Sequence, residues 1–210
     1  MKVVAMTHYN WISMSDEEEA SLLDKVNDAT VSKIFKQGRS NFAFAELPFY
    51  KNFKLLRVTA YTTIPPVSMR FLLGGSAPDW KIVKMNGTNE PIFEHNAEAG
   101  LVLNKDTVVD YVTFVMGEVH SEEGSLRVVE EVDDDTFSST PTPEERRTVT
   151  HLIRKAKVEE NADGFTVDAT MLYGDSVYWA KIAVKKDGMI EIVEDDKKAE
   201  NMPIRPIYLE

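Results

Sequence analysis

Apolar and polar positions alternate regularly along the C-terminal third of the chain, which is typical of antiparallel strands with one buried face. Two such runs, residues 165–173 and 176–184, flank a two-residue Gly-Asp turn. The register that this turn sets places Asp168 opposite Lys181 and gathers the apolar residues on one face. The pattern therefore predicts a hairpin with a defined register.

A further strand follows the second strand of this hairpin. A three-residue loop, with Gly188 in the left-handed conformation, places Val184 opposite Ile190 and keeps one face apolar. A two-residue turn would place Val184 opposite Glu191 and mix the two faces. The alternation therefore favours the three-residue loop.

Upstream of the hairpin, the sequence favours one helical turn near Pro143 and then a strand over residues 150–160. A helix through this segment also fits the apolar spacing and stays an alternative. On a strand, Arg154 would lie on the apolar face beside Ala169. A buried guanidinium needs a carboxylate or an anionic ligand, so Arg154 is expected to be largely buried and paired.

The N-terminal half begins with a helix expected over residues 16–37. Ser15 and Glu18 form a capping box, an apolar stripe at helical spacing follows, and Gly38 is a natural stop. Aromatic and β-branched runs then predict strands at residues 41–47, 53–61, 68–73 and 80–85. Residues 104–120 carry an apolar stripe that predicts a second helix, with a strand as the alternative, and residues 126–132 predict another strand.

Together these elements predict an α+β fold, in which an antiparallel β-sheet meander packs against an N-terminal helix and a central helix. A single domain over residues 1–210 is expected. The acidic and Ser/Thr/Pro-rich segment 133–143 is the one linker-like stretch, between an N-terminal part and the C-terminal β-meander.

Charge and composition narrow the class of partner. The 210 residues include 35 acidic and 24 basic residues, which gives a formal net charge of −11, and the basic residues are scattered among acids. Neither nucleic acid nor a membrane is an expected partner. The chain has no cysteine and no apolar run of the roughly 20 residues that span a bilayer, so a cytoplasmic location is expected.

Catalytic signatures are missing from the sequence. The phosphate-binding glycine loop, the paired histidines of zinc proteases and the serine elbow of hydrolases are all absent. The sequence therefore predicts no cofactor and no metal site, and it leaves open whether the protein is an enzyme.

Two groups of residues are candidates for binding. The first would line a pocket for a small anionic ligand: Arg154, Tyr111, His120 and Tyr178. The second is an apolar group on the other face of the hairpin, which self-association or a protein partner would cover: Ile153, Leu172, Val177 and Trp179. Cover of this second group by the N-terminal helix is the alternative.

These candidates favour a non-catalytic binding or assembly protein, with a homo-oligomer expected through the Trp179 face. The alternative is a small enzyme or anion-binding protein with a cystatin-like pocket around Arg154, Tyr111 and His120, which rests on analogy of fold alone.

Overall fold

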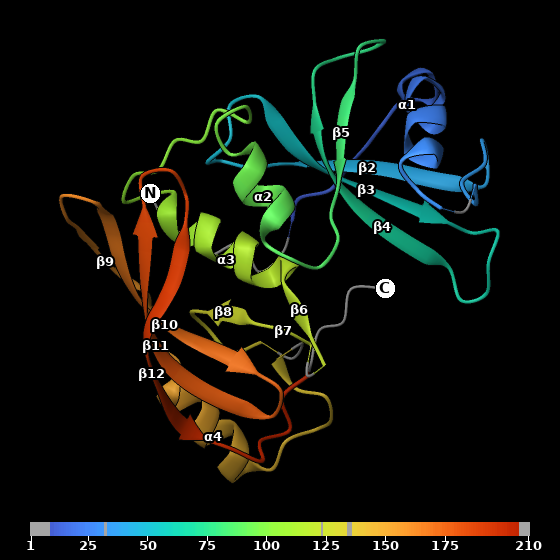
Figure 1. Ribbon diagram of the computed structural model, residues 1–210. Helices are drawn as coiled ribbons and strands as arrows, with labels where there is room; N and C mark the ends of the chain where they lie inside the picture. Colours follow the sequence, from blue (N-terminus) through green and yellow to red (C-terminus); the bar gives the residue numbers. More distant parts are fainter. Residues whose placement is uncertain (1–8, 32, 123, 134–135, 206–210) are drawn as a thin grey trace. The chain divides into compact units, whose positions relative to one another are not determined.

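The computed structural model describes residues 9–205 except residues 32, 123, 134 and 135. Contacts between Cα atoms divide the chain into two compact units, with the division between Leu101 and Val102. We call the described residues 9–101 the N-terminal unit and 102–205 the C-terminal unit. Both combine helices with antiparallel strands, which confirms the α+β class (Figure 1). The single domain expected over residues 1–210 stays a prediction.

The N-terminal unit is a five-stranded meander in the order β1-β2-β3-β4-β5. Its elements are β1 (Ile12–Ser13), α1 (Asp16–Asp28), β2 (Ser40–Glu46), β3 (Phe53–Ala60), β4 (Val67–Gly74), β5 (Lys81–Lys84) and α2 (Glu90–His95). The four strands predicted between residues 41 and 85 are thus confirmed with small shifts at their ends.

Helix α1 packs on one face of this sheet. Its Leu22 and Val26 are fully buried and belong to the same core cluster as Val58 of β3 and Phe71 of β4. The capping box expected at Ser15 is present, because its hydroxyl accepts from the backbone of Glu18, whose carboxylate accepts in return. The N-terminal helix is therefore stabilised both at its start and along its apolar face.

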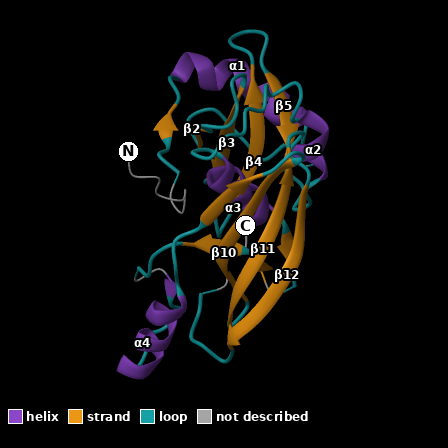
Figure 2. Ribbon diagram, turned by 90° about the vertical axis from the view of Figure 1, so that its left-hand side faces the viewer, coloured by secondary structure: helices purple, strands orange, loops and turns teal. Residues whose placement is uncertain are grey.

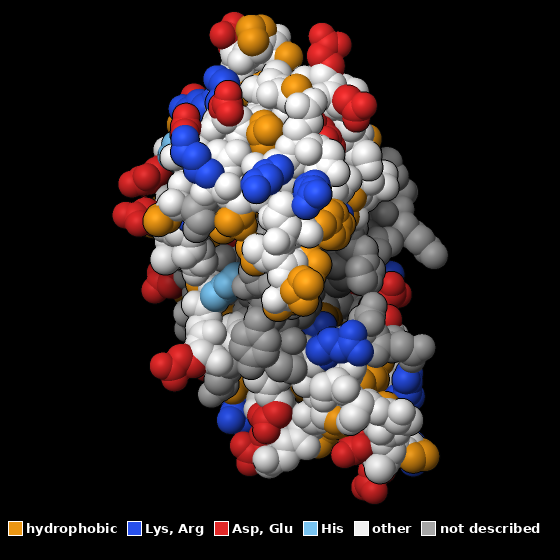
Figure 3. Space-filling view, turned by 90° about the vertical axis from the view of Figure 1, so that its right-hand side faces the viewer, with side chains coloured by type: hydrophobic (Ala, Val, Ile, Leu, Met, Phe, Trp, Pro, Cys, Tyr) orange, Lys and Arg blue, Asp and Glu red, His pale blue; other side chains and the backbone are white. Residues whose placement is uncertain are grey.

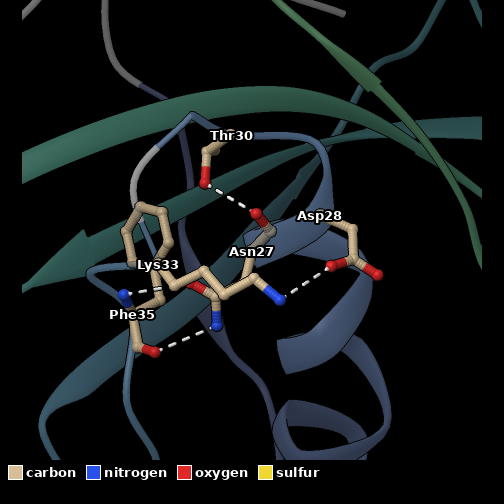
Figure 4. Close-up of polar contacts among 5 residues, drawn as sticks. All are labelled: Asn27, Asp28, Thr30, Lys33 and Phe35. Atoms are coloured by element: carbon tan, nitrogen blue, oxygen red, sulfur yellow. Dashed lines mark hydrogen bonds and ion pairs between the residues drawn. The ribbon is translucent and has the colours of Figure 1, made fainter.

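The predicted end of this helix at residue 37 is wrong, because α1 stops at Asp28. Figure 4 shows the reason, a buried Asn27 whose side chain bonds the backbone of Phe35. Its Nδ2 donates to the Phe35 carbonyl at 3.0 Å, and its Oδ1 accepts from the Phe35 amide at 3.3 Å. The chain turns back on itself here, so the apolar residues beyond Asp28 reach the core from a loop.

The C-terminal unit holds a second sheet in the order β12-β11-β10-β8, with β9 also paired to β10, and a small two-stranded sheet of β6 and β7. Figure 2 shows its long strands β10, β11 and β12 side by side. Its elements are α3 (Val108–Glu118), β6 (His120–Ser121), β7 (Gly124–Ser125), β8 (Arg127–Val129), α4 (Pro143–Leu152), β9 (Lys157–Glu160), β10 (Gly164–Tyr173), β11 (Ser176–Lys185) and β12 (Ile190–Ala199).

The predicted hairpin register is confirmed. Asp168 lies opposite Lys181, and Val184 lies opposite Ile190. Gly188 has a φ of 89°, as the three-residue loop requires. Side-chain alternation and turn chemistry together were sufficient to fix this part of the sheet.

The predicted strand over residues 150–160 is only partly correct. Helix α4 continues to Leu152, and the strand begins only at Lys157. A capping box at Thr142 and proline in the first turn start this helix. Arg154 lies between the two elements and is exposed, so the expectation that it is buried is wrong.

Helix α3 confirms the central helix expected over residues 104–120, with shorter bounds. It is buried around almost its whole circumference, and the hydroxyl of its Tyr111 donates to the Gly188 carbonyl at 2.8 Å. Among the helices that the structure describes, none has the length and apolar character needed to cross a lipid bilayer.

Candidate functional site

The four residues of the predicted anion pocket do not come together. Tyr111 is fully buried and bonds Gly188, beyond one end of β11, whereas Tyr178 lies near the other end of that strand. The separation along β11 is roughly 20 Å. Arg154 contacts Trp179, whose side chain points to the face opposite that of Tyr178, and His120 starts the separate β6 strand.

The predicted interface residues do come together, but the chain's own elements cover them. Leu172 and Val177 are buried at 1% and 0% exposure in a cluster with Val149 of α4, and Ile153 packs against it. The indole N–H of Trp179 donates to the Leu152 carbonyl at 2.8 Å. Cover within the chain was expected only as the alternative to self-association, and then from the N-terminal helix, whereas the structure places α4 on this group.

Trp179 remains half-buried between two cations. The guanidinium carbon of Arg154 lies 4.0 Å from the ring centroid, and Lys198 Nζ lies 4.3 Å from it. Lys198 also forms an ion pair with Asp196. Such contacts stabilise the half-buried ring of Trp179, so Arg154 has a partner here without an anion.

The N-terminal unit carries a cationic site that the sequence alone does not predict. Antiparallel pairing of β3 with β4 places Arg57 directly opposite Arg70 on the sheet face that does not carry Val58 and Phe71. Directly opposite side chains have Cβ atoms about 5 Å apart, and like charges at that distance repel each other. Two guanidinium groups are therefore held together on one sheet surface.

Arg57 is the more confined of the two arginines. Its side chain is half-buried, and its Nε is buried and forms no hydrogen bond to the residues that the structure describes. Burial lowers the pKa of Arg57, and repulsion from Arg70 lowers the pKa further, with Tyr61 acting in the opposite direction. An unsatisfied donor of this kind is unfavourable until an acceptor reaches it.

Two aromatic rings and two hydroxyl groups adjoin the arginine pair. The guanidinium carbon of Arg57 lies 4.3 Å from the centroid of Trp11, whose ring is 5.4 Å from that of Tyr9. Thr59 and Ser68 form the next opposed pair on this face, and their hydroxyl oxygens are 2.7 Å apart. We call the set of Trp11, Arg57, Thr59, Ser68 and Arg70 the arginine site.

The arginine site suits the binding of an oxyanion. A guanidinium presents planar, parallel donors that match the oxygens of a carboxylate or a phosphate, and hydroxyl groups add further donors. The strand positions next to the arginines on this face hold Thr59, Ser68, Ala43, Leu55 and Leu72, none of which is a general acid or base near neutral pH. In the described part of the chain, no three or more His, Asp or Glu side chains gather as ligands for a metal ion.

Comparisons of the chain with protein-family models, with curated proteins and with solved structures found no match.

Proposed function

We propose that this protein is a non-catalytic binding protein whose arginine site takes up a ligand that carries a phosphate group. The opposed pair of Arg57 and Arg70 carries this proposal, because Arg57 brings a buried Nε–H that bonds no described residue. A bound oxyanion would supply the missing acceptor and neutralise the repulsion between the two cations.

Phosphate fits this arrangement better than a single carboxylate does. Two guanidinium groups carry two positive charges, which match a phosphate dianion, and a phosphate presents more oxygens than a carboxylate does. The hydroxyl groups of Thr59 and Ser68 lie one strand repeat away from the arginines, about 7 Å along the sheet. They can therefore bond a second part of the same ligand.

A titration with inorganic phosphate, followed by nitrogen-15 NMR, tests the proposal. The Nε–Hε signal of Arg57 is the reporter, and acetate at equal ionic strength is the comparison. We expect a saturable shift with phosphate and a much smaller one with acetate. Arg57→Met should weaken phosphate binding about tenfold or more, because a hydrogen bond to a charged group contributes about 1.5–3 kcal/mol.

Two matched variants show whether the loss is local. Arg147→Met removes an exposed arginine from α4 and should leave phosphate binding unchanged. Arg154→Met removes the arginine of the pocket that the sequence predicts, and it should also leave phosphate binding unchanged. A phosphate shift that never saturates would overturn the proposal. A loss of binding in Arg154→Met but not in Arg57→Met would move the site to the C-terminal unit.

A further inference from the structure

The most exposed large apolar side chains of the described residues gather on two loops of the N-terminal unit. Val31 lies in the loop between α1 and β2 and is 102% exposed, which is full exposure. Ile64 and Tyr61, in the loop between β3 and β4, are 101% and 61% exposed. The other large apolar side chains identified as exposed are below 50%.

These two loops are bonded to each other. The Thr62 hydroxyl donates to the Ile34 carbonyl at 2.9 Å, and the Tyr61 amide donates to the Arg39 carbonyl at 3.0 Å. We call the described residues 29–31, 33–39 and 61–66 together the loop pair. Because the loops are bonded to each other, they present their apolar side chains from one end of the sheet.

The charge of the loop pair is opposite to that of the chain. The first loop carries Lys33, Lys36 and Arg39 and no acid. Even with Asp28, which pairs with Lys33 at 3.4 Å, three basic residues stand against one acid, which leaves a net charge of +2. The second loop carries no charge, whereas the whole chain has a net charge of −11.

Both loops lie at the right-hand edge of Figure 1 and therefore face the viewer in Figure 3. On the part of this face that belongs to the N-terminal unit, Figure 3 shows apolar side chains with Lys and Arg side chains beside them. The loop pair thus combines exposed apolar side chains with neighbouring cations, although the chain as a whole is acidic.

We infer that the loop pair docks on the surface of a membrane that contains anionic lipid, with Val31 and Ile64 entering its apolar layer. Full exposure leaves both side chains able to enter a soft apolar medium without any rearrangement of the fold. Burial of such side chains in an apolar layer is favourable, and lysine and arginine beside them are attracted to an anionic surface. This inference does not depend on the arginine site, and it departs from the expectation that no membrane is a partner.

Vesicle flotation with the whole chain tests the inference. The probe is vesicles of equal parts phosphatidylcholine and phosphatidylserine, compared with vesicles of phosphatidylcholine alone. We expect binding to the anionic vesicles that weakens as salt is raised, and little binding to the neutral ones. Ile64→Ser and Val31→Ser should each reduce the partition coefficient about tenfold.

Control variants separate insertion from general effects on the surface. Val193→Ser removes a 46% exposed valine from β12, in the other unit, and should bind as the wild type does. Lys36→Gln combined with Arg39→Gln should weaken binding and reduce its dependence on salt. Arg57→Met should leave vesicle binding unchanged, so failure of the arginine site and failure of the loop pair give different results.

Three results would overturn the inference. The first is equal binding of wild type and Ile64→Ser, and the second is no binding to anionic vesicles at low salt. The third is a change in the sedimentation of the lipid-free protein caused by Ile64→Ser, because the loop pair would then join two copies of the chain.

Discussion

Replacement of Trp179 by alanine shows whether the sheet face that carries it is covered by α4 within one chain or by a second copy of the chain. The indole ring is half-buried, stacks on Arg154 and Lys198, and donates its N–H to the Leu152 carbonyl. If α4 covers this face within one chain, Trp179→Ala should destabilise the folded monomer at every protein concentration. If self-association covers it, the variant should weaken the oligomer and leave the monomer folded.

The contacts of Trp179 set the size of the effect. Truncation of a fully buried tryptophan costs about 3–5 kcal/mol, and half burial reduces that to about 2. Loss of the hydrogen bond to Leu152 adds about 1 kcal/mol, and the two cation contacts add about 0.5 each. We therefore expect Trp179→Ala to lower the free energy of unfolding by about 4 kcal/mol. Trp179→Phe keeps an aromatic ring and should lower the free energy of unfolding by about 1–2 kcal/mol.

Urea unfolding at two protein concentrations measures the free energy of unfolding, and light scattering of the native protein measures its oligomeric state. A loss that is the same at both concentrations supports cover by α4. A loss below about 1 kcal/mol, or one that appears only in the oligomer, would refute the reasoning and restore the predicted interface of Trp179 with Leu172 and Val177.

Two further predictions concern the N-terminal helix. Asn27→Ala leaves the buried amide and carbonyl of Phe35 without the partners they have in the wild type, and should cost about 2–4 kcal/mol in urea unfolding, whereas the exposed Asp28→Ala should cost under about 0.5. The backbone of Ser15 lowers the pKa of Glu18, so the stabilisation by this carboxylate is complete above its ordinary pKa of about 4.3 and is lost as the pH falls through the lowered value. The difference in unfolding free energy between wild type and Glu18→Gln should therefore shrink toward zero in acid, and a difference that stays constant would contradict this assignment.

How far the sequence predicts this fold depends on whether one face of a strand is uniformly apolar. In β10 and β11 the two faces differ clearly and the turn is short, so a shift of one residue would bury charge. That is why the predicted register, with Asp168 opposite Lys181, is confirmed. Regular alternation and a two-residue turn leave few other registers for this hairpin.

Strand β3 gives no such signal. Phe53, Leu55, Leu56 and Val58 are all buried, so its apolar residues lie on both faces. A six-residue loop follows it, and a loop of that length fixes no register. Without the register, nothing in the sequence places Arg57 opposite Arg70, although both strands were predicted. The arginine site is therefore visible only once β3 and β4 are paired.

The two errors near helix ends have a different cause, because in each the spacing of apolar residues continued past the end of the element. Beyond Asp28, Ile34 keeps helical spacing, yet it packs on the core from a loop held by Asn27. The strand alternation of β9 predicts a strand back to residue 150, past Arg154, although the capping box at Thr142 starts a helix that runs to Leu152. Tertiary hydrogen bonds and a nucleated helix prevailed over periodicity in these places.

The arginine site also bears on stability, and this separates a binding role from a structural one. If the opposed arginines only supported the fold, removal of Arg57 would destabilise the protein, because a structural charge has partners that are lost with it. Arg57 instead combines repulsion from Arg70, partial burial and a buried donor that bonds no described residue. Methionine keeps an apolar side chain against Trp11. It removes the repulsion from Arg70, the cost of burying a charge and the donor that bonds no described residue. Arg57→Met should therefore unfold at a temperature no lower than that of the wild type in phosphate-free buffer, and lose the rise in unfolding temperature that phosphate gives the wild type. A protein whose Arg57→Met variant melts well below the wild type without phosphate would be using this arginine for its fold.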